Sequence, residues 1–391
     1  MSNISRKAAI VGIGTSEFSR DSGRTELRMV CECLKEAMDD AGLVPADIDG
    51  IVKHTDESPD EQAVVSSMGM ENLAYFGECR WDGAPGGMVL RAAIGVATGM
   101  ANYVAVYRAV NGSSGLRQGT SSRDMDQMST GDILQYSFHA PFGHSSEPGR
   151  VAMTVQRYMH EFGIEADSFG WVPVVCREHG AKNPNGRYFD KPLSFDDYRQ
   201  SEMIVDPLRR MDCYEPADAA VAFIVTTAEK ARDLRQKPAC IIGAAQSSVS
   251  GTEEKNGFYR PGITGLPEVS NVGKRLFSMA GIRPQDIDVA QLDDAYGPFV
   301  PLQLEALGFC DPGEGADFCA GGKRIRLGGQ LPLNTSGGSL GEGYLYGMNH
   351  VIEAVRQIRG ISTAQVDGAR LALVATGAGG PASGLIIGDS V

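Results

Sequence analysis

Residues 41–49 read AGLVPADID and residues 280–288 read AGIRPQDID, and this repeated stretch decides the fold. The two copies are identical at six of nine positions, and Leu43 is matched by the similar Ile282. Each copy follows a helical pattern of apolar residues and precedes a strand-like apolar run, so the surroundings match as well as the letters. A helix–turn–strand unit that occurs twice in this way predicts a duplicated chain with two related halves.

Strand-like and helical patterns alternate around both copies. Alternation of this kind predicts an α/β fold, with helices on the faces of mainly parallel sheets. The predicted strands are 7–14, 50–52, 73–76, 103–107, 217–227 and 371–375, and the predicted helices are 25–41, 88–97 and 347–359. We expect an N-terminal half over 1–233 and a C-terminal half over 234–391. Residues 111–215 are expected to form an inserted loop or lid region over the site, because long irregular segments in compact domains are usually functional.

Composition excludes several classes of protein. The net charge of −13, without a long Lys/Arg run, argues against sequence-independent nucleic-acid binding. No stretch approaches the roughly 20 apolar residues of a membrane helix, and the first residues lack the apolar core of a secretory signal, so we expect a cytoplasmic protein. The eight cysteines contain no C-x-x-C pair and the six histidines no H-x-x-x-H spacing. This pattern favours reduced thiols and no metal site.

Four stretches together resemble the thiolase superfamily, particularly the sterol-carrier-protein type of thiolase. They are NPNGRYFDKPLSFDDYRQSEMIVDPLRRMDCYEPADAAVAFIV (183–225), LDDAYGPF (292–299), NTSGGSLGEGYLYG (334–347) and ATGAGG (375–380). They occur in the family's order. The resemblance implies a duplicated thiolase fold, with two βαβαβαββ halves in a five-layered α-β-α-β-α arrangement.

The catalytic positions of the family are changed in this chain. Matched residue by residue, the catalytic His becomes Tyr344, the second Cys becomes Ala375, the Asn or His of the 292–299 motif becomes Asp293, and its Phe becomes Tyr296. The nucleophilic Cys of the family matches a place near Asp82, and Cys79 lies about three residues earlier. Without a nucleophile there is no group to carry the acyl fragment of a thiolase reaction.

A retro-aldol cleavage of a β-hydroxyacyl thioester needs no nucleophile. It needs a base for the hydroxyl proton and stabilisation of the acyl-CoA enolate that is left. We therefore expect Tyr344 and Tyr296 to transfer protons, with Asp293 and Asp294 tuning or orienting Tyr296.

The resemblance also implies residues that bind substrate. Gly377 and the backbone of Asp82 and Gly83 match an oxyanion hole. Gly337 and Gly338 either permit close backbone approach to the thioester or are ordinary turn glycines. Two further candidates for lining the pocket are Tyr346 and His144.

These expectations predict a C–C lyase that cleaves a bulky β-hydroxyacyl-CoA without a cofactor. The resemblance to bacterial lipid-transfer-protein-like steroid aldolases implies a 17-hydroxy steroid side chain, and a 17-keto steroid and propionyl-CoA as products. It also implies a homodimer that binds a small OB-fold and zinc-ribbon domain of a hydratase subunit. Two alternatives remain open: a non-catalytic lipid- or acyl-CoA-binding subunit, and an acyl-CoA thiolase that uses Cys79.

Overall fold

The computed structural model of the chain describes residues 4–79, 83–115, 130, 137–138, 140–144, 146–250, 260 and 262–389. The first half contains β1 (Ala8–Thr15), α1 (Glu26–Ala41), β2 (Gly50–His54), α2 (Glu61–Met68), β3 (Tyr75–Cys79), α3 (Ala84–Ala97), β4 (Tyr103–Asn111), β7 (Asp218–Thr227) and α8 (Ala228–Ala231). The second half contains β8 (Ala239–Ser247), α9 (Pro267–Ala280), β9 (Val289–Leu292), α10 (Phe299–Ala306), α11 (Gly315–Cys319), α12 (Gly338–Gly341), α13 (Met348–Arg359), β10 (Leu371–Thr376) and β11 (Ala382–Gly388).

The predicted strands and helices are present, with shifts at two of them. Helix α3 begins at Ala84, because Pro85 fits the first turn of a helix and so extends the predicted helix towards its N-terminus. The strand predicted at 73–76 is formed by Tyr75–Cys79.

The described strands form a nine-stranded sheet in the order β3-β2-β4-β7-β1-β8-β11-β10-β9. Among the strands that the structure describes, only β3, β2 and β4 in the first half, and β9 and β10 in the second, pair in parallel. β7 and β11 run antiparallel to both of their neighbours. The expectation of mainly parallel sheets was therefore wrong, because the last strand of each half inserts in the opposite direction between the first strand and the parallel set.

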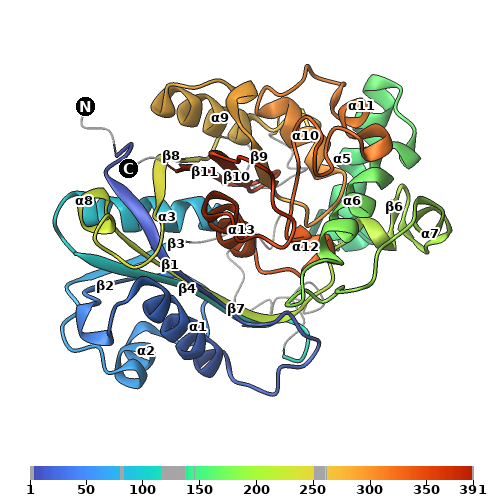
Figure 1. Ribbon diagram of the computed structural model, residues 1–391. Coiled ribbons are helices and arrows are strands. Elements are labelled where there is room, and N and C mark those ends of the chain that lie inside the picture. The colour runs from blue at the N-terminus through green and yellow to red at the C-terminus, as the bar shows by residue number, and fades with distance from the viewer. Residues whose placement is uncertain are drawn as a thin grey trace.

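The sheet folds into two layers, because β1 and β8 pair over only two residues of each strand. Figure 1 shows α9 and α10 over the second-half strands, then α3 and α13 between the two groups of strands, then α1 and α2 beneath the first-half strands. This is the five-layered arrangement expected from the resemblance. The central layer is apolar, with Met88, Val89, Met348 and Val351 fully buried.

The two copies of the repeated stretch have the same local structure. Gly42 and Gly281 both end a helix in the left-handed conformation, with φ of 78° and 68°. Asp49 accepts the backbone N–H groups of Asn102 and Tyr103 at the start of β4, and Asp288 accepts those of Arg370 and Leu371 at the start of β10. Matching hydrogen bonds at matching places support a duplication, whereas the boundary at residue 233 stays a prediction.

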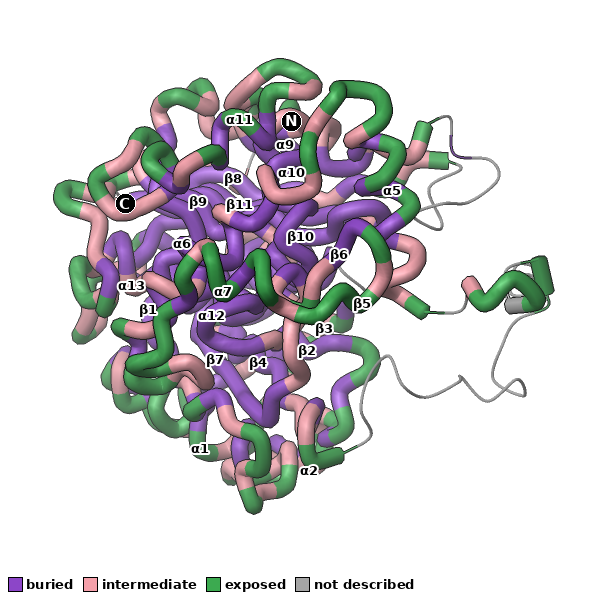
Figure 2. Tube along the Cα trace, turned by 90° about the vertical axis from the view of Figure 1, so that its right-hand side faces the viewer, coloured by how far each residue is buried: buried purple, intermediate pink, exposed green. Residues whose placement is uncertain are grey.

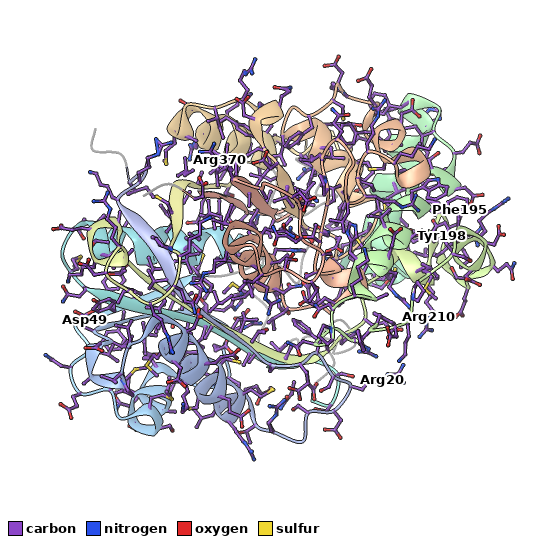
Figure 3. The ribbon with its side chains drawn as sticks, viewed as in Figure 1. Arg20, Asp49, Phe195, Tyr198, Arg210 and Arg370 are labelled. Atoms are coloured by element: carbon purple, nitrogen blue, oxygen red, sulfur yellow. The ribbon has the colours of Figure 1, made fainter. Side chains whose placement is uncertain are left out.

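The chain between β4 and β7 carries short helices and a hairpin. Its described elements are α5 (Glu147–Phe162), α6 (Trp171–Gly180), α7 (Phe195–Gln200), β5 (Met203–Val205) and β6 (Leu208–Arg209). Figure 3 shows Phe195 and Tyr198 together at one side of the molecule, far from Asp49. Phe195 stacks on Trp171, with ring centroids 4.3 Å apart. This contact packs α7 against α6 within the inserted region, and the ion pair between Glu178 of α6 and Arg326, at 2.8 Å, joins that region to the second half.

The inner elements of the layered fold are buried and the outer ones are exposed. Figure 2 shows the strands and α12 in the buried interior and α7 at the surface. In the part of the chain that the structure describes, no helix is both long enough and apolar enough to cross a membrane.

Candidate active site

Tyr296 lies just after β9, in the turn that leads into α10. It is 3% exposed and forms an antiparallel bridge with Cys213. The bridge is closed by two backbone hydrogen bonds, from the Tyr214 N–H to the Ala295 carbonyl at 2.9 Å and from the Gly297 N–H to the Asp212 carbonyl at 2.8 Å. The end of the inserted region therefore fixes the backbone of Tyr296.

Tyr344 lies in the loop between α12 and α13. It is half-buried, and its backbone forms a parallel bridge with Pro216. The segment 212–216 thus pairs with Tyr296 through one residue and with Tyr344 through another three positions later. Two tyrosines that are far apart in the sequence are held by one short segment of the first half.

The rings of four tyrosines form a continuous cluster between the two halves. Tyr214 stacks on Tyr344, with centroids 3.9 Å apart and planes at 28°. It also meets Tyr296 edge-on at 5.9 Å and 76°. Tyr346 lies 4.8 Å from Tyr344. We call these four residues the tyrosine cluster.

Tyr214 was not among the residues expected from the sequence. It lies in the stretch that resembles the family, but no family motif assigns a role to that position. Its place between Tyr296 and Tyr344 depends on the two bridges, and local sequence patterns do not predict such long-range pairing.

The surroundings of Tyr296 keep its phenol protonated. Burial raises the pKa of Tyr296 far above its ordinary value, and nearby groups including Tyr214 and Glu147 add to the rise. A phenol in this state stays protonated, so it donates a hydrogen bond readily and gives up its proton only to a stronger base such as a thioester enolate. Tyr344 differs, because it is less buried and precedes the N-terminus of the 12-residue helix α13, where negative charge is favoured.

The carboxylate of Asp293 binds the loop that follows β10. It accepts the Gly377 N–H at 3.1 Å and the Ala295 N–H at 3.1 Å. In the same loop, the Gly379 N–H donates to Glu268 at 3.0 Å. The Gly377 N–H is therefore already engaged, and a substrate oxyanion at that place would have to displace the Asp293 carboxylate.

Asp294 has the contacts of a positioning residue. It is fully buried, accepts the Ser339 and Leu340 N–H groups at 2.8 and 3.2 Å, and lies 3.3 Å from Nε2 of the buried His350. Burial alone would raise the pKa of Asp294, but the pairing with His350 and the two N–H donors lower it. Asp294 thus ties α12 to α13 on either side of the Tyr344 loop, which differs from the expected role of orienting Tyr296.

Gly337 and Gly338 are required by packing. A Cβ on Gly338 would lie 2.3 Å from Oδ2 of Asp294, and one on Gly337 would lie 2.6 Å from the Cα of Gly180. Both residues also have positive φ, of 108° for Gly337 and 61° for Gly338. These contacts favour the turn-glycine interpretation of the two expected alternatives.

The expected oxyanion backbone is only partly described. Asp82 lies outside the described residues. Gly83 precedes α3 and approaches the loop after β10, since a Cβ on Gly83 would lie 3.1 Å from the Pro381 carbonyl oxygen. A Cβ on Gly377 would lie 2.4 Å from the same oxygen. The structure therefore brings Gly83 and Gly377 close to the same carbonyl oxygen.

His144 and Cys79 lie at two further places around the site. His144 is half-buried, and its Nδ1 lies 3.4 Å from the place of a Cβ on Gly149, in the first turn of α5. Cys79 ends β3 and is 4% exposed. Its Sγ lies 3.3 Å from Nε2 of Gln246 and 3.4 Å from Nη1 of Arg91. The burial of Cys79 leaves little open space beside its thiol for a large acyl group.

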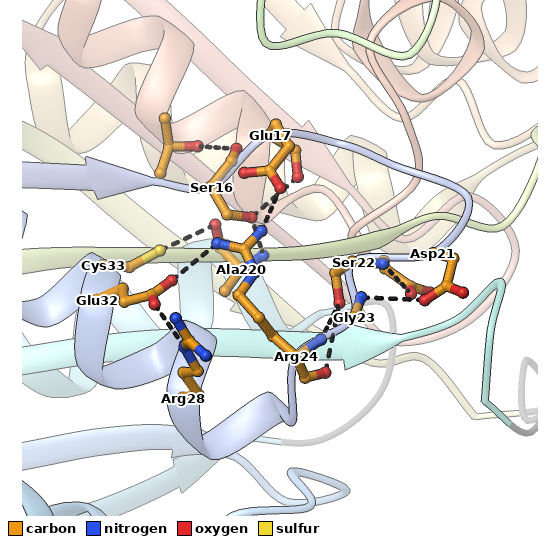
Figure 4. A network of polar contacts seen from close by, with 12 residues as sticks. Ser16, Glu17, Asp21, Ser22, Gly23, Arg24, Arg28, Glu32, Cys33 and Ala220 are labelled. Atoms are coloured by element: carbon orange, nitrogen blue, oxygen red, sulfur yellow. Dashed lines mark hydrogen bonds and ion pairs between the residues drawn. The ribbon is translucent and has the colours of Figure 1, made fainter.

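A loop of the first half packs against the residue before Tyr344. Phe18 is 4% exposed, and a Cβ on Gly343 would lie 2.6 Å from its ring. Figure 4 shows how Arg24 ties this loop to α1, through ion pairs with Glu17 and Glu32. The position of the Tyr344 loop thus depends on contacts from both halves.

Over the described ranges, no three His, Cys, Asp or Glu side chains are placed to hold a metal ion.

Comparisons with known proteins agree with this geometry. Residues 250–387 match the family model described as thiolase C-terminal domain-like. The chain is 43% identical over 386 residues to the 17-hydroxy-3-oxo-4-pregnene-20-carboxyl-CoA lyase of Mycobacterium tuberculosis, covering 98% of this chain and 100% of the relative. It is 44% identical over 391 residues to the steroid side-chain-cleaving aldolase of Thermomonospora curvata, covering 99% of each.

Solved structures give the same result. The structure of an Ltp2-ChsH2(DUF35) aldolase matches with a TM-score of 0.94 at 43% identity, covering 99% of each chain. Human mitochondrial 3-ketoacyl-CoA thiolase shares the fold alone, with a TM-score of 0.67 at 14% identity over 100% of each chain. The chain therefore belongs to the aldolase branch of the thiolase superfamily and is a carbon–carbon lyase of CoA thioesters.

Proposed function

We propose that the chain cleaves the CoA thioester of a 17-hydroxy steroid side chain by a retro-aldol reaction, releasing a 17-keto steroid and propionyl-CoA. The names of the two relatives support the substrate. The observation that carries the mechanism is the tyrosine cluster, in which Tyr214 contacts both Tyr344, which stands at the place of the family's catalytic His, and Tyr296, which stands at the place of its Phe. The reaction needs no cofactor in this scheme.

In the proposed reaction the enzyme takes one proton from the substrate hydroxyl and gives one proton to the enolate product. A base takes the proton of the β-hydroxyl, the Cα–Cβ bond breaks as the ketone forms, and the electron pair of that bond enters the thioester as an enolate. An acid then protonates the enolate at Cα. We assign Tyr344 as the base, because it is less buried and precedes α13, and Tyr296 as the acid, because its surroundings keep it protonated.

The remaining residues would shape and polarise the site. The backbone around Gly83 and Gly377 would stabilise the enolate oxygen once Asp293 gives up the Gly377 N–H. Asp294 and the glycines at 337 and 338 would hold the Tyr344 loop. Tyr346 would form part of the pocket wall, and His144 would line it beside α5.

We further propose that the enzyme works in the cytoplasm as a homodimer bound to a small OB-fold and zinc-ribbon domain. The solved relative, an aldolase with a DUF35 component, supports such a partner.

The test is incubation with a 17-hydroxy steroid acyl-CoA, alone and with a candidate partner, followed by mass spectrometry of both products. Equal amounts of ketone and propionyl-CoA are expected. Tyr344→Phe and Tyr296→Phe should each lower the rate by about 10²–10⁴-fold, as for loss of a general acid or base. Tyr103→Phe is the matched control, because Tyr103 opens β4 and lies by Lys230, outside the tyrosine cluster.

Two results would replace the proposal. Wild-type rates in both phenylalanine variants would reject the assigned residues. Substrate binding without cleavage would favour a binding subunit, and an acyl group trapped on Cys79 would favour a thiolase.

A further inference from the structure

An arginine lies on the apolar face of β4. Val104 and Val106 point into the central layer between the two groups of strands, and the alternation of a strand places Arg108 on the same face. Arg108 is 1% exposed. A charged side chain at such a place is costly unless it is paired.

Arg108 is paired with an equally buried carboxylate. Its Nη1 lies 3.0 Å from Oε2 of Glu57, whose side chain is 0% exposed, and the other Glu57 oxygen accepts the Ala109 N–H at 2.6 Å. Among the described residues, however, Nε of Arg108 has no hydrogen-bond partner. Since a buried ion pair usually adds little net stability, and an unsatisfied donor costs about 1–3 kcal/mol, folding alone does not explain this arginine.

The guanidinium group of Arg108 lies over a member of the tyrosine cluster. Its Cζ is 4.6 Å from the centroid of the Tyr346 ring, the geometry of a cation–π contact. Tyr346 has a φ of 53°, which is unfavourable for a residue with a bulky side chain. The ring of His54 lies 5.7 Å away on the side of the first half. Contacts from β2 and β4 thus hold Tyr346 in a conformation that it would otherwise leave.

We propose that Arg108, fixed by Glu57, is a positioning residue for catalysis. It holds the ring of Tyr346, and that ring supports the ring of Tyr344, whose centroid lies 4.8 Å away. The inference rests on the proposed function, because it assumes that Tyr344 takes the substrate proton. A displacement of about 1 Å in such a group is enough to cost about 10²-fold in rate.

The kinetic test compares Arg108→Met with Arg108→Lys. Arg108→Met should lower kcat by about 10–100-fold while KM changes less than about threefold, because substrate still binds but the base is misplaced. Arg108→Lys retains a cation over the ring and should recover most of the loss. Tyr346→Leu, which removes the ring under the guanidinium group, should resemble Arg108→Met.

Two further variants separate positioning from stability. Arg108→Met combined with Glu57→Gln removes both charges while the introduced amide oxygen can still accept the Ala109 N–H, so this double variant avoids an unpaired buried anion and should fold. It should show the same loss of kcat. The matched control is Lys53→Met on the adjacent strand β2, because Lys53 is also buried and paired, with Glu78 at 3.0 Å, and it should keep wild-type kinetics.

A spectroscopic readout tests the inference without relying on turnover. In protein labelled with 3-fluorotyrosine, the ¹⁹F resonance of Tyr344 is identified by its loss in Tyr344→Phe. Arg108→Met should shift this resonance and Lys53→Met should not. An unshifted resonance, an unchanged kcat in the double variant, or an effect on KM alone would overturn the inference. A wild-type protein that makes no ketone would overturn the proposed function instead, and the resonance would still decide the role of Arg108 in holding the ring.

Discussion

Replacing Asp294 by Asn should destabilise the protein, because it breaks a fully buried ion pair. The carboxylate accepts two N–H groups and pairs with His350, and both side chains are 0% exposed. Removing one partner of such a pair typically costs about 3–5 kcal/mol. With an unfolding entropy of about 2 cal/mol/K per residue over 391 residues, the loss corresponds to a decrease in Tm of about 4–6 °C.

The pH dependence of this loss follows from the two pKa shifts. Burial would lower the pKa of His350, but the pairing with Asp294 outweighs burial and raises this pKa above 6.5. The stabilisation by charged His350 is therefore complete below pH 6.5 and is lost as the pH rises through the higher pKa of the folded state. The pKa of Asp294 is lowered from 3.8, so its contribution is present above 3.8 and is lost as pH falls through the lower folded value. The difference between wild type and Asp294→Asn should therefore be largest between about pH 4 and 6.5, and should narrow at higher pH.

Urea unfolding at about pH 5.5, 7 and 9 measures this difference. Asp389→Asn is the control, because Asp389 forms an exposed pair with Arg370 at 3.3 Å and should cost less than about 1 kcal/mol. A loss in Asp294→Asn no larger than in the control would refute the reasoning. A difference that grows with pH would refute the assignment of the charges.

The other predictions concern packing and the reaction. Gly338→Ala should cost more than about 2 kcal/mol in chemical unfolding, since its Cβ would meet Oδ2 of Asp294, whereas Gly360→Ala, with positive φ but open space around it, should cost only about 1 kcal/mol. Tyr214→Leu should lower kcat about tenfold in the cleavage assay, and Tyr214→Phe, which keeps the stacked ring, should not; equal rates in both would contradict a supporting role. Cys79→Ala should cleave within about threefold of the wild-type rate, and any acyl adduct lost with Cys79 would count against a nucleophile-free reaction.

The sequence predicts the fold well where local signals are strong. The repeated helix–turn–strand unit, with Gly42 and Gly281 ending their helices, predicts two halves that the structure shows to have the same local geometry. The direction of β7 and β11 is not predictable in the same way. A buried strand is equally apolar whether it runs parallel or antiparallel to its neighbours, so the pattern cannot reveal its direction.

The site is predictable only where the resemblance aligns one residue with another. Tyr296 and Tyr344 were expected on that basis, and the structure places both against Tyr214, but their roles await the kinetic test. The segment 212–216 pairs with positions about 80 and 130 residues away, and no local pattern encodes such pairing. A signal for Arg108 is present in YVAVYRAV (103–110), where one charged residue interrupts an apolar face.

The backbone bridge at Tyr296 fixes the position of this residue independently of its side chain. Both hydrogen bonds that close it are made by main-chain atoms, so its geometry does not depend on which side chain is attached there. Tyr344 is likewise bridged through its backbone to Pro216. A phenol can therefore stand at position 344, where the resemblance implies an imidazole in the thiolases, and the scaffold need not be rebuilt. Such an arrangement lets one fold acquire a different reaction through single substitutions at positions whose backbone is already fixed.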